Sequence, residues 1–285
     1  MYAGSGAGKR HQKERLGGGE LDAAAVVSQL LVPRGPNWAR ARVGRLVVNR
    51  ESPENKYLGP GRRHAAASLP ARDAPRNYSS CAVVGNGGVL LRGEYGPAID
   101  AHSAVFRFND GPTEGFERHV GSRTTFRLVN NAWTRAWLKK PPPGATQEAL
   151  VLFGMSAARS YEQLVRKYPG TDVLFMAPEF AGTARGQYKR AYVLMEEAGV
   201  IKVAGRNSPP TGVEGIFFAI AACERVHLYG FGVVPDSTVP YHYHDKVRGV
   251  EAAHSFSFQG MFLRVLSQGG ESFAVCVPGL ATEEC

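Results

Sequence analysis

The chain has 285 residues, enough for one large domain or two small ones, and its 44% hydrophobic content allows a sizeable core. Its formal net charge is +9, but residues 1–76 carry fourteen Lys and Arg against six Asp and Glu, a net of +8. The rest of the chain is therefore close to neutral. This distribution argues against nucleic-acid binding by the part that shows strand and helix patterns.

Residues 1–76 are rich in Gly, Ala, Pro and Arg and show no sustained hydrophobic periodicity. Such a composition cannot bury enough apolar surface to offset its ordering entropy, so we predict a largely disordered, basic stem or linker. Residues 21–33 are the exception and predict a short helix. That run is shorter than the roughly 20 apolar residues that cross a bilayer, and no signal-peptide pattern precedes it. We therefore expect no membrane span in this chain.

From about residue 78 onward, apolar runs alternate with helical patterns. Most of the runs are almost continuously apolar, which is typical of strands covered on both faces. The predicted strands are residues 81–85, 104–109, 124–130, 149–154, 172–177, 225–231 and 272–277.

Four segments between these runs have helical periodicity: residues 156–168, 184–199, 211–223 and 255–270. Thr211 is followed three residues later by Glu214, the pattern of a capping box. Strands that alternate with helices indicate an α/β fold with a mainly parallel central sheet and helices on both faces.

The first predicted strand ends in the turn Gly85-Asn86-Gly87-Gly88. Sheets of this class bind ligands beyond the carboxyl ends of their strands. Glycines there allow close approach and positive φ, and an asparagine offers both a donor and an acceptor. A plain turn without a ligand has the same pattern, so the residues leave both interpretations open. The spacing matches neither a dinucleotide-binding motif nor a P-loop.

The four cysteines, Cys81, Cys223, Cys276 and Cys285, include no Cys-x-x-Cys pair. A zinc site is therefore not predicted, and from the residues alone buried thiols are the plain interpretation. The chain also shows no Asp-x-Asp pair that would suit a divalent ion, so no metal is predicted.

Residues 81–127 resemble the large motif of the eukaryotic sialyltransferase family. They begin Cys-x-Val-Val-Gly-Asn, continue through Gly-x-x-Ile-Asp-x-His and Arg-x-Asn-x-x-Pro-Thr, and end Val-Gly-x-Arg-Thr-Thr. Residues 209–232 look like the small motif, 242–245 (His-Tyr-His-Asp) resemble the third motif, and His254 stands where the last motif begins. The four occur in family order, over about residues 78–277.

The resemblance implies a Rossmann-like nucleotide-binding sandwich, the GT-A variant of sialyltransferases, formed here by residues 77–285. It implies an inverting glycosyltransferase that moves sialic acid from CMP-sialic acid to a glycan hydroxyl without a metal or other cofactor. The expected partners are the CMP-sugar donor and a glycan acceptor, and the expected location is the Golgi lumen. In the family the two motif cysteines pair, which implies a Cys81–Cys223 disulfide and an oxidising compartment.

Five residues match positions that contact the donor in the family. Asn86 and Asn109 are expected to face the CMP moiety, Thr211 and Gly212 to lie near the cytidine, and Gly232 to contact the CMP-sugar. Thr211 also opens a predicted helix, whose free N–H groups suit an anionic nucleotide.

The resemblance makes His254 the expected general base, which would take the proton of the attacking hydroxyl. His242 would assist the phosphate of departing CMP. His244 is a second imidazole in the same segment, and Asp245 could orient either ring.

The chain departs from the family pattern at Gln259, Pro210 and Gly87, where Glu, Ser and Ser are usual. The membrane anchor expected of the family is not seen in these residues, so we expect a fragment, a mis-assigned start or another route to the lumen. These departures resemble those of divergent plant or algal relatives, so the donor could be another CMP-linked ulosonic acid such as CMP-Kdo. They also motivate an alternative: a catalytically inactive relative that binds glycan or CMP. The sequence does not identify the acceptor or the linkage.

Overall fold

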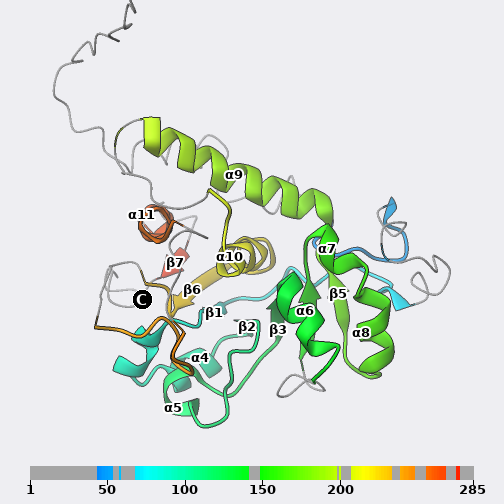
Figure 1. Cartoon of the computed structure of the whole chain (residues 1–285), viewed down its shortest axis with the longest axis horizontal. Helices are drawn as coiled ribbons and strands as arrows, with labels where there is room; N and C mark the ends of the chain where they lie inside the picture. The colour runs from blue at the N-terminus through cyan, green and yellow to red at the C-terminus, as the bar shows by residue number, and fades with distance from the viewer. Residues whose placement is uncertain are drawn as a thin grey trace, which may run out of the picture.

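The computed structural model describes residues 44–53, 58, 68–140, 148–197, 199, 207–232, 238–247, 255–267 and 274–276. Its centre is a seven-stranded sheet in the order β5-β4-β3-β2-β1-β6-β7, and every strand pairing is parallel (Figure 1). The predicted parallel α/β sheet is confirmed. The strands are β1 (Cys81–Val84), β2 (Ala104–Phe108), β3 (Phe126–Val129), β4 (Ala149–Leu152), β5 (Val173–Phe175), β6 (Arg225–Tyr229) and β7 (Ala274–Cys276).

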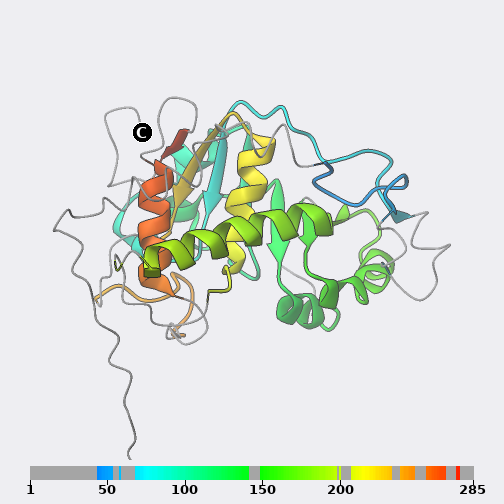
Figure 2. The ribbon, with the colours of Figure 1, turned by 90° about the horizontal axis from the view of Figure 1, so that it is seen from above.

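Helices cover both faces of the sheet, as predicted. Helices α9, α10 and α11 lie on one side and α4 and α5 on the other, with α6, α7 and α8 beside β4 and β5 (Figures 1 and 2). The helical elements are η3 (Gly88–Arg92), α4 (Gly96–Asp100), α5 (Glu117–Val120), α6 (Asn131–Trp137), α7 (Met155–Ala158), α8 (Tyr161–Lys167), α9 (Pro178–Glu197), α10 (Thr211–Ala222) and α11 (Phe256–Ser267). Among the described residues, no helix is both long and apolar enough to cross a membrane.

Strand β1 shows why its sequence is apolar throughout. Cys81 and Val83 face the cluster beneath α10, while Ala82 and Val84 face the cluster that includes α4 and α5. All four residues are buried. Successive side chains of a strand point to opposite faces, so covering both faces makes every position apolar.

The sequence patterns predicted where helices and strands occur more accurately than where each one begins and ends. The predicted helix over 156–168 is two short helices, α7 and α8, and α9 begins at Pro178 instead of residue 184. Proline suits the first position of a helix, where its missing N–H leaves no bond unmade. The exposed Gly182 and Gly186 interrupt the apolar pattern of α9, which weakened its signal.

The folded part of the chain begins before the predicted boundary at residue 77. Leu46, Val47 and Val48 are fully buried, and Val47 forms an antiparallel bridge with Met176 just beyond β5. The Asp73 carboxylate accepts hydrogen bonds from the amides of Leu46 (2.8 Å) and Val47 (2.9 Å). This apolar run covers the edge strand of the sheet, so residues 44–53 are not part of a disordered stem. The rest of that prediction falls mainly on residues outside the described ones.

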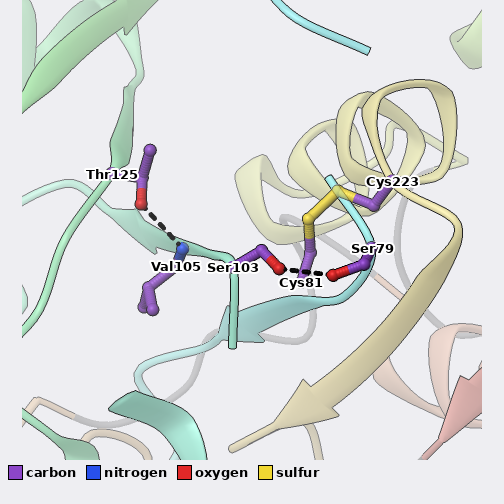
Figure 3. Close-up of a disulfide and its surroundings, with 6 residues drawn as sticks. All are labelled: Ser79, Cys81, Ser103, Val105, Thr125 and Cys223. Carbon is purple, nitrogen blue, oxygen red and sulfur yellow. Dashed lines mark hydrogen bonds between the residues drawn. A yellow bond between two sulfur atoms is a disulfide. The ribbon is translucent and has the colours of Figure 1, made fainter. Parts of the chain in front are cut away.

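The predicted Cys81–Cys223 disulfide is confirmed (Figure 3). It joins the first residue of β1 to the carboxyl end of α10, and Tyr78 pairs with Cys223 in a parallel bridge. Nearby, the hydroxyl groups of Ser79 and Ser103 hydrogen-bond at 2.6 Å. The disulfide therefore fixes α10 to the amino-terminal edge of the sheet. Whether Cys276 and Cys285 pair lies outside what the structure describes.

Replacing both Cys81 and Cys223 by Ser should lower the free energy of unfolding substantially. The bond closes a loop across a sequence separation of 142 residues. In the chain-entropy model, such a loop contributes about 5 kcal/mol. Denaturant unfolding should show an earlier midpoint for the variant than for the oxidised wild type. Reductant should destabilise the wild type and leave the variant unchanged, whereas equal midpoints would contradict the prediction.

Stability should also fall as the pH is lowered from 6.5 to 4. His102 is buried against the ring of His227, with 4.5 Å between centroids, and bonds the Tyr229 hydroxyl at 3.2 Å. Burial, and then the charges of His227, Arg225 and Arg123, lower the pKa of His102 to about 4. Between pH 6.5 and 4 the unfolded state therefore binds more protons, so acidification favours unfolding.

Urea unfolding at stepwise pH should show this decrease, and His102→Gln should make it shallower. His227 contributes in the same direction, because burial and Arg225 lower its pKa. Above pH 7.5 the variant and the wild type should keep a constant difference. An unchanged slope in His102→Gln would exclude His102 as the cause.

Candidate functional site

The strand order reverses direction between β1 and β6. The chain runs from β1 outward through β2 to β5 and then returns to β6 on the other side of β1. Such a reversal of direction is where parallel sheets bind ligands, beyond the carboxyl ends of the strands. The start of α10, residues 238–247 and the start of α11 gather at this end of the molecule (Figure 2).

The glycine turn after β1 packs against two other backbone segments. The amides of Gly85 and Gly87 donate to the carbonyls of Tyr229 (2.7 Å) and Gly230 (3.1 Å). A Cβ on Gly87 would lie 2.4 Å from the Gly230 oxygen, and one on Gly88 would lie 2.4 Å from the Pro240 oxygen. These glycines are therefore required by the protein's own backbone. The expectation of positive φ is wrong here, since Gly87 has φ −63° and neither Gly85 nor Gly88 has a positive φ.

The two predicted asparagines come together at the ends of β1 and β2. Asn86 donates from Nδ2 to the carbonyl of Phe108 at 3.4 Å. Asn109 is the one described non-glycine residue with positive φ (51°), and its Oδ1 accepts from the Asn130 amide at 3.2 Å. A Cβ on Gly111 would lie 2.5 Å from Asn86 Oδ1. The glycine thus allows Asn86 to lie directly against the loop that follows β2.

Asn130, at the end of β3, is a site residue that the sequence reasoning missed. Its Oδ1 accepts from the amides of Ala132 (3.0 Å) and Trp133 (3.1 Å), which caps α6. Its Nδ2 donates to the Thr211 hydroxyl at 3.5 Å. An asparagine at the carboxyl end of a predicted strand, as at Asn109, was the available signal. Asn130 connects the asparagine pair to the beginning of α10.

Helix α10 begins one residue earlier than a capping box requires. Pro210 is the N-cap and makes no side-chain cap, while Thr211 is the first helical residue. The predicted capping box is wrong because Glu214 points inward, where it forms an ion pair with Arg185 of α9. Burial raises the pKa of Glu214, although Arg185 opposes the shift. The side chain of Pro210, the N-cap residue, accepts no hydrogen bond from the first turn of α10. The amino terminus of this helix therefore keeps backbone N–H groups that suit an anion.

Gly212 lies against the ring of Phe231, and Gly232 follows Phe231 in sequence. A Cβ on Gly212 would lie 2.7 Å from that ring, so the glycine permits the contact between α10 and the segment after β6. Gly232 is exposed, and a Cβ there would meet nothing within 4 Å. Both residues lie at the same edge of the sheet as Thr211.

In the 242–247 segment, Asp245 orients His242. The Asp245 carboxylate bonds His242 Nδ1 at 2.8 Å and accepts from the Val247 amide at 2.9 Å. His244 Nδ1 lies 3.8 Å from the same carboxylate, and the two imidazoles stack with 5.2 Å between centroids. Partial burial raises the pKa of Asp245, but these hydrogen bonds outweigh it and the net shift is downward. Of the two imidazoles, His242 is therefore the one that Asp245 holds.

Tyr243 attaches this segment to the asparagines. Its amide donates to the carbonyl of Asn86 at 2.9 Å, and its hydroxyl donates to the carbonyl of Pro112 at 2.5 Å. His242 precedes Tyr243 in sequence and is thereby brought to the carboxyl ends of β1 and β2, where Asn86 and Asn109 lie. Within the described residues, His242, His244 and Asp245 also offer ligand atoms within 4.8 Å of one another, a group that could hold a metal ion.

The expected general base, His254, lies outside the described residues. Gln259 of α11 is buried, and its backbone N–H donates to the carbonyl of Ser255 at 3.0 Å. A cavity of about 720 Å³ opens at the opposite, amino-terminal edge of the sheet, lined in part by Tyr78, Thr124 and Glu148. None of the predicted site residues lines it.

Sequence comparison identifies the family. The model of "Glycosyltransferase family 29 (sialyltransferase)" matches residues 62–270. The chain belongs to glycosyltransferase family 29. This match covers most of the chain and confirms the sialyltransferase resemblance that the four motifs indicated.

Individual family 29 relatives are distant. Beta-galactoside alpha-2,6-sialyltransferase 2 of Takifugu rubripes is 27% identical over 236 residues, which are 76% of this chain and 44% of the relative. Sialyltransferase-like protein 1 of Arabidopsis thaliana is 32% identical over 178 residues, 61% of this chain and 32% of the relative. The chain spans about half the length, or less, of these relatives.

A solved mammalian sialyltransferase has a similar fold. The crystal structure of a mammalian sialyltransferase in complex with Gal-beta-1-3GalNAc-ortho-nitrophenol superposes with a TM-score of 0.51 at 21% identity. The match covers 92% of this chain and 87% of the other. This similarity supports the sialyltransferase variant of the nucleotide-binding sandwich as the fold.

Gly87→Ala should destabilise the protein by about 1–3 kcal/mol, because the added methyl group meets a backbone oxygen that cannot rotate away. Gly182→Ala is the matched control: it lies in α9, and its Cβ would meet nothing within 4 Å. That change should stabilise the protein by up to about 1 kcal/mol. Urea unfolding midpoints should move in opposite directions. A Gly87→Ala variant as stable as the wild type would disprove the close contact.

Proposed function

We propose that this family 29 chain is an inverting transferase that moves a CMP-linked acidic sugar to a glycan hydroxyl without a metal ion. The observation that carries the proposal is the convergence of Asn86, Asn109, Thr211 and His242 at the edge of the sheet where parallel α/β folds bind ligands. The relatives' names contribute sialic acid as the first donor sugar to test.

In this proposal, the asparagines and α10 bind the CMP moiety. The amide side chains of Asn86 and Asn109 supply donors and acceptors, and the beginning of α10 at Thr211 and Gly212 presents N–H groups and a positive dipole end to the nucleotide. Gly232 lies beside this region, exposed and without a side chain. Asn130 hydrogen-bonds the side chains of both Asn109 and Thr211 and so fixes their relative positions.

His242 acts on the leaving group. Asp245 accepts a hydrogen bond from His242 Nδ1–H, which fixes the orientation of the imidazole ring. The opposite nitrogen, Nε2–H, then donates to the phosphate as CMP departs with the electron pair of the broken glycosidic bond. This interaction strengthens as negative charge develops on the phosphate, so it lowers the barrier to bond breaking.

His254 is the proposed general base. The acceptor hydroxyl attacks the anomeric carbon from the face opposite CMP, its proton passes to His254, and the configuration inverts. The catalytic domain comprises residues 77–285 together with the packed segments before residue 77, preceded by the basic stem. We place it in the Golgi lumen, an oxidising compartment that would preserve the Cys81–Cys223 disulfide.

A second candidate function is a non-catalytic relative that binds CMP or a glycan. Pro210 supplies no hydroxyl at the N-cap of α10, and Gln259 is neutral and buried where the family pattern has a carboxylate. Both features favour binding without turnover.

Release of CMP from CMP-sialic acid and from CMP-Kdo, measured in parallel with and without EDTA, tests the proposal. The wild type should release CMP from one donor in the presence of EDTA. His242→Ala and His254→Ala should each slow release by about 100-fold or more, the usual contribution of such groups. His119→Ala, whose ring bonds the carbonyl of Gly93 outside the proposed site, is the control and should retain activity.

CMP binding without release from either donor would favour the non-catalytic relative, and Gln259→Glu would be the first reversion to test. Loss of release in EDTA, restored by added metal, would contradict metal independence. Absence of CMP binding would refute the transferase and would leave only a glycan-binding relative.

A further inference from the structure

One buried ion pair lies next to the loop of residues 109–112, which follows β2 and contains Asn109. Arg127 of β3 and Glu148, just before β4, are 2% and 3% exposed. Arg127 Nε donates to Glu148 Oε1 at 2.6 Å, and Nη2 donates to Oε2 at 3.1 Å. This two-point pairing fixes the plane of the guanidinium group.

The remaining terminal nitrogen of Arg127 binds the loop itself. Nη1 donates to the carbonyls of Gly111 (2.8 Å) and Asn109 (3.3 Å). Asn109 has a φ of 51°, a conformation that is uncommon outside glycine. Such a backbone persists only where its surroundings hold it. Arg127 is therefore one of the groups that hold Asn109 in this conformation.

The same loop supports the rest of the proposed site. Asn86 lies against Gly111, with room for no side chain between them. Tyr243 donates its hydroxyl to the next carbonyl, that of Pro112, and its amide to Asn86. A displacement of residues 109–112 would therefore move Asn86 and the segment that carries His242 as well as Asn109.

We propose that Arg127 is the positioning residue of the donor site: oriented by Glu148, it fixes the 109–112 loop and through it Asn86, Asn109 and the His242 segment. This inference rests on the proposed function, because it assigns the loop to CMP binding. Arg127 does not touch the donor in this proposal. Its effect on binding is transmitted by the loop backbone.

The test compares three variants in the full chain. Arg127→Lys keeps the charge, but one ammonium group cannot span Glu148 and both carbonyls. Glu148→Gln is nearly isosteric and removes only the orienting charge, so it remains informative if Arg127→Lys folds poorly. Leu150→Ala controls for a general loss of stability. Leu150 is a fully buried residue of β4, where it lies opposite Arg127 of β3. It makes none of the loop contacts described above.

Two readouts are measured: the Kd for CMP, and hydrogen exchange of the Gly111 and Tyr243 amides in the ligand-free protein. Arg127→Lys should weaken CMP binding about tenfold or more, since small displacements of binding groups cost that much. It should also speed exchange at both amides. Glu148→Gln should act in the same direction and more weakly. Leu150→Ala should lower the melting temperature but leave the Kd within about twofold.

Unchanged exchange at Gly111 and Tyr243 in Arg127→Lys would overturn the inference. So would an equal loss of CMP affinity in Leu150→Ala, because the effect would then be general destabilisation. If the wild type fails to bind CMP, the proposed function is wrong, while the exchange measurement still decides whether Arg127 positions the loop.

Discussion

The architecture of the candidate site depends on a close approach of backbones at the carboxyl end of β1. Gly87 and Gly88 allow the first turn to lie directly against Gly230, after β6, and Pro240. Segments more than a hundred residues apart in sequence therefore share one edge of the sheet. Together with the hydrogen bonds of Tyr243 to Asn86 and Pro112, this contact holds the 238–247 segment, and with it His242, near the asparagines.

Two buried arginines, on β2 and β3, bind the carbonyl groups of nearby loops and hold those loops in place. Arg107 and Arg127 lie side by side on β2 and β3, both almost completely buried. Arg107 binds the carbonyls of Val120 and Arg123, and burial lowers its pKa to about 10. Arg127 binds the 109–112 loop and Glu148. A buried guanidinium is costly unless it is bonded, so each arginine strongly favours one loop conformation.

Patterns of apolar residues predicted the long elements because burial on both faces leaves a clear trace in sequence. The short helices η3, α4, α5 and α6 were not predicted, since four to seven residues are too few to establish a helical period. The capping box failed for a different reason: Glu214 satisfies a tertiary partner, Arg185, instead of its own helix. Asn130 was missed because its role depends on Asn109 and Thr211, which are distant in sequence.

By itself, the sequence determined the α/β class, the parallel sheet and the family resemblance, because these rest on periodicity and on motif order along the chain. It also marked Asn86, Asn109, Thr211 and His242 through that resemblance. Only the tertiary structure showed which backbone contacts require Gly87 and Gly88, which imidazole Asp245 holds and that residues 46–49 are buried in the core. Each of those outcomes depends on contacts between segments far apart in the chain, and such contacts leave no local pattern to read.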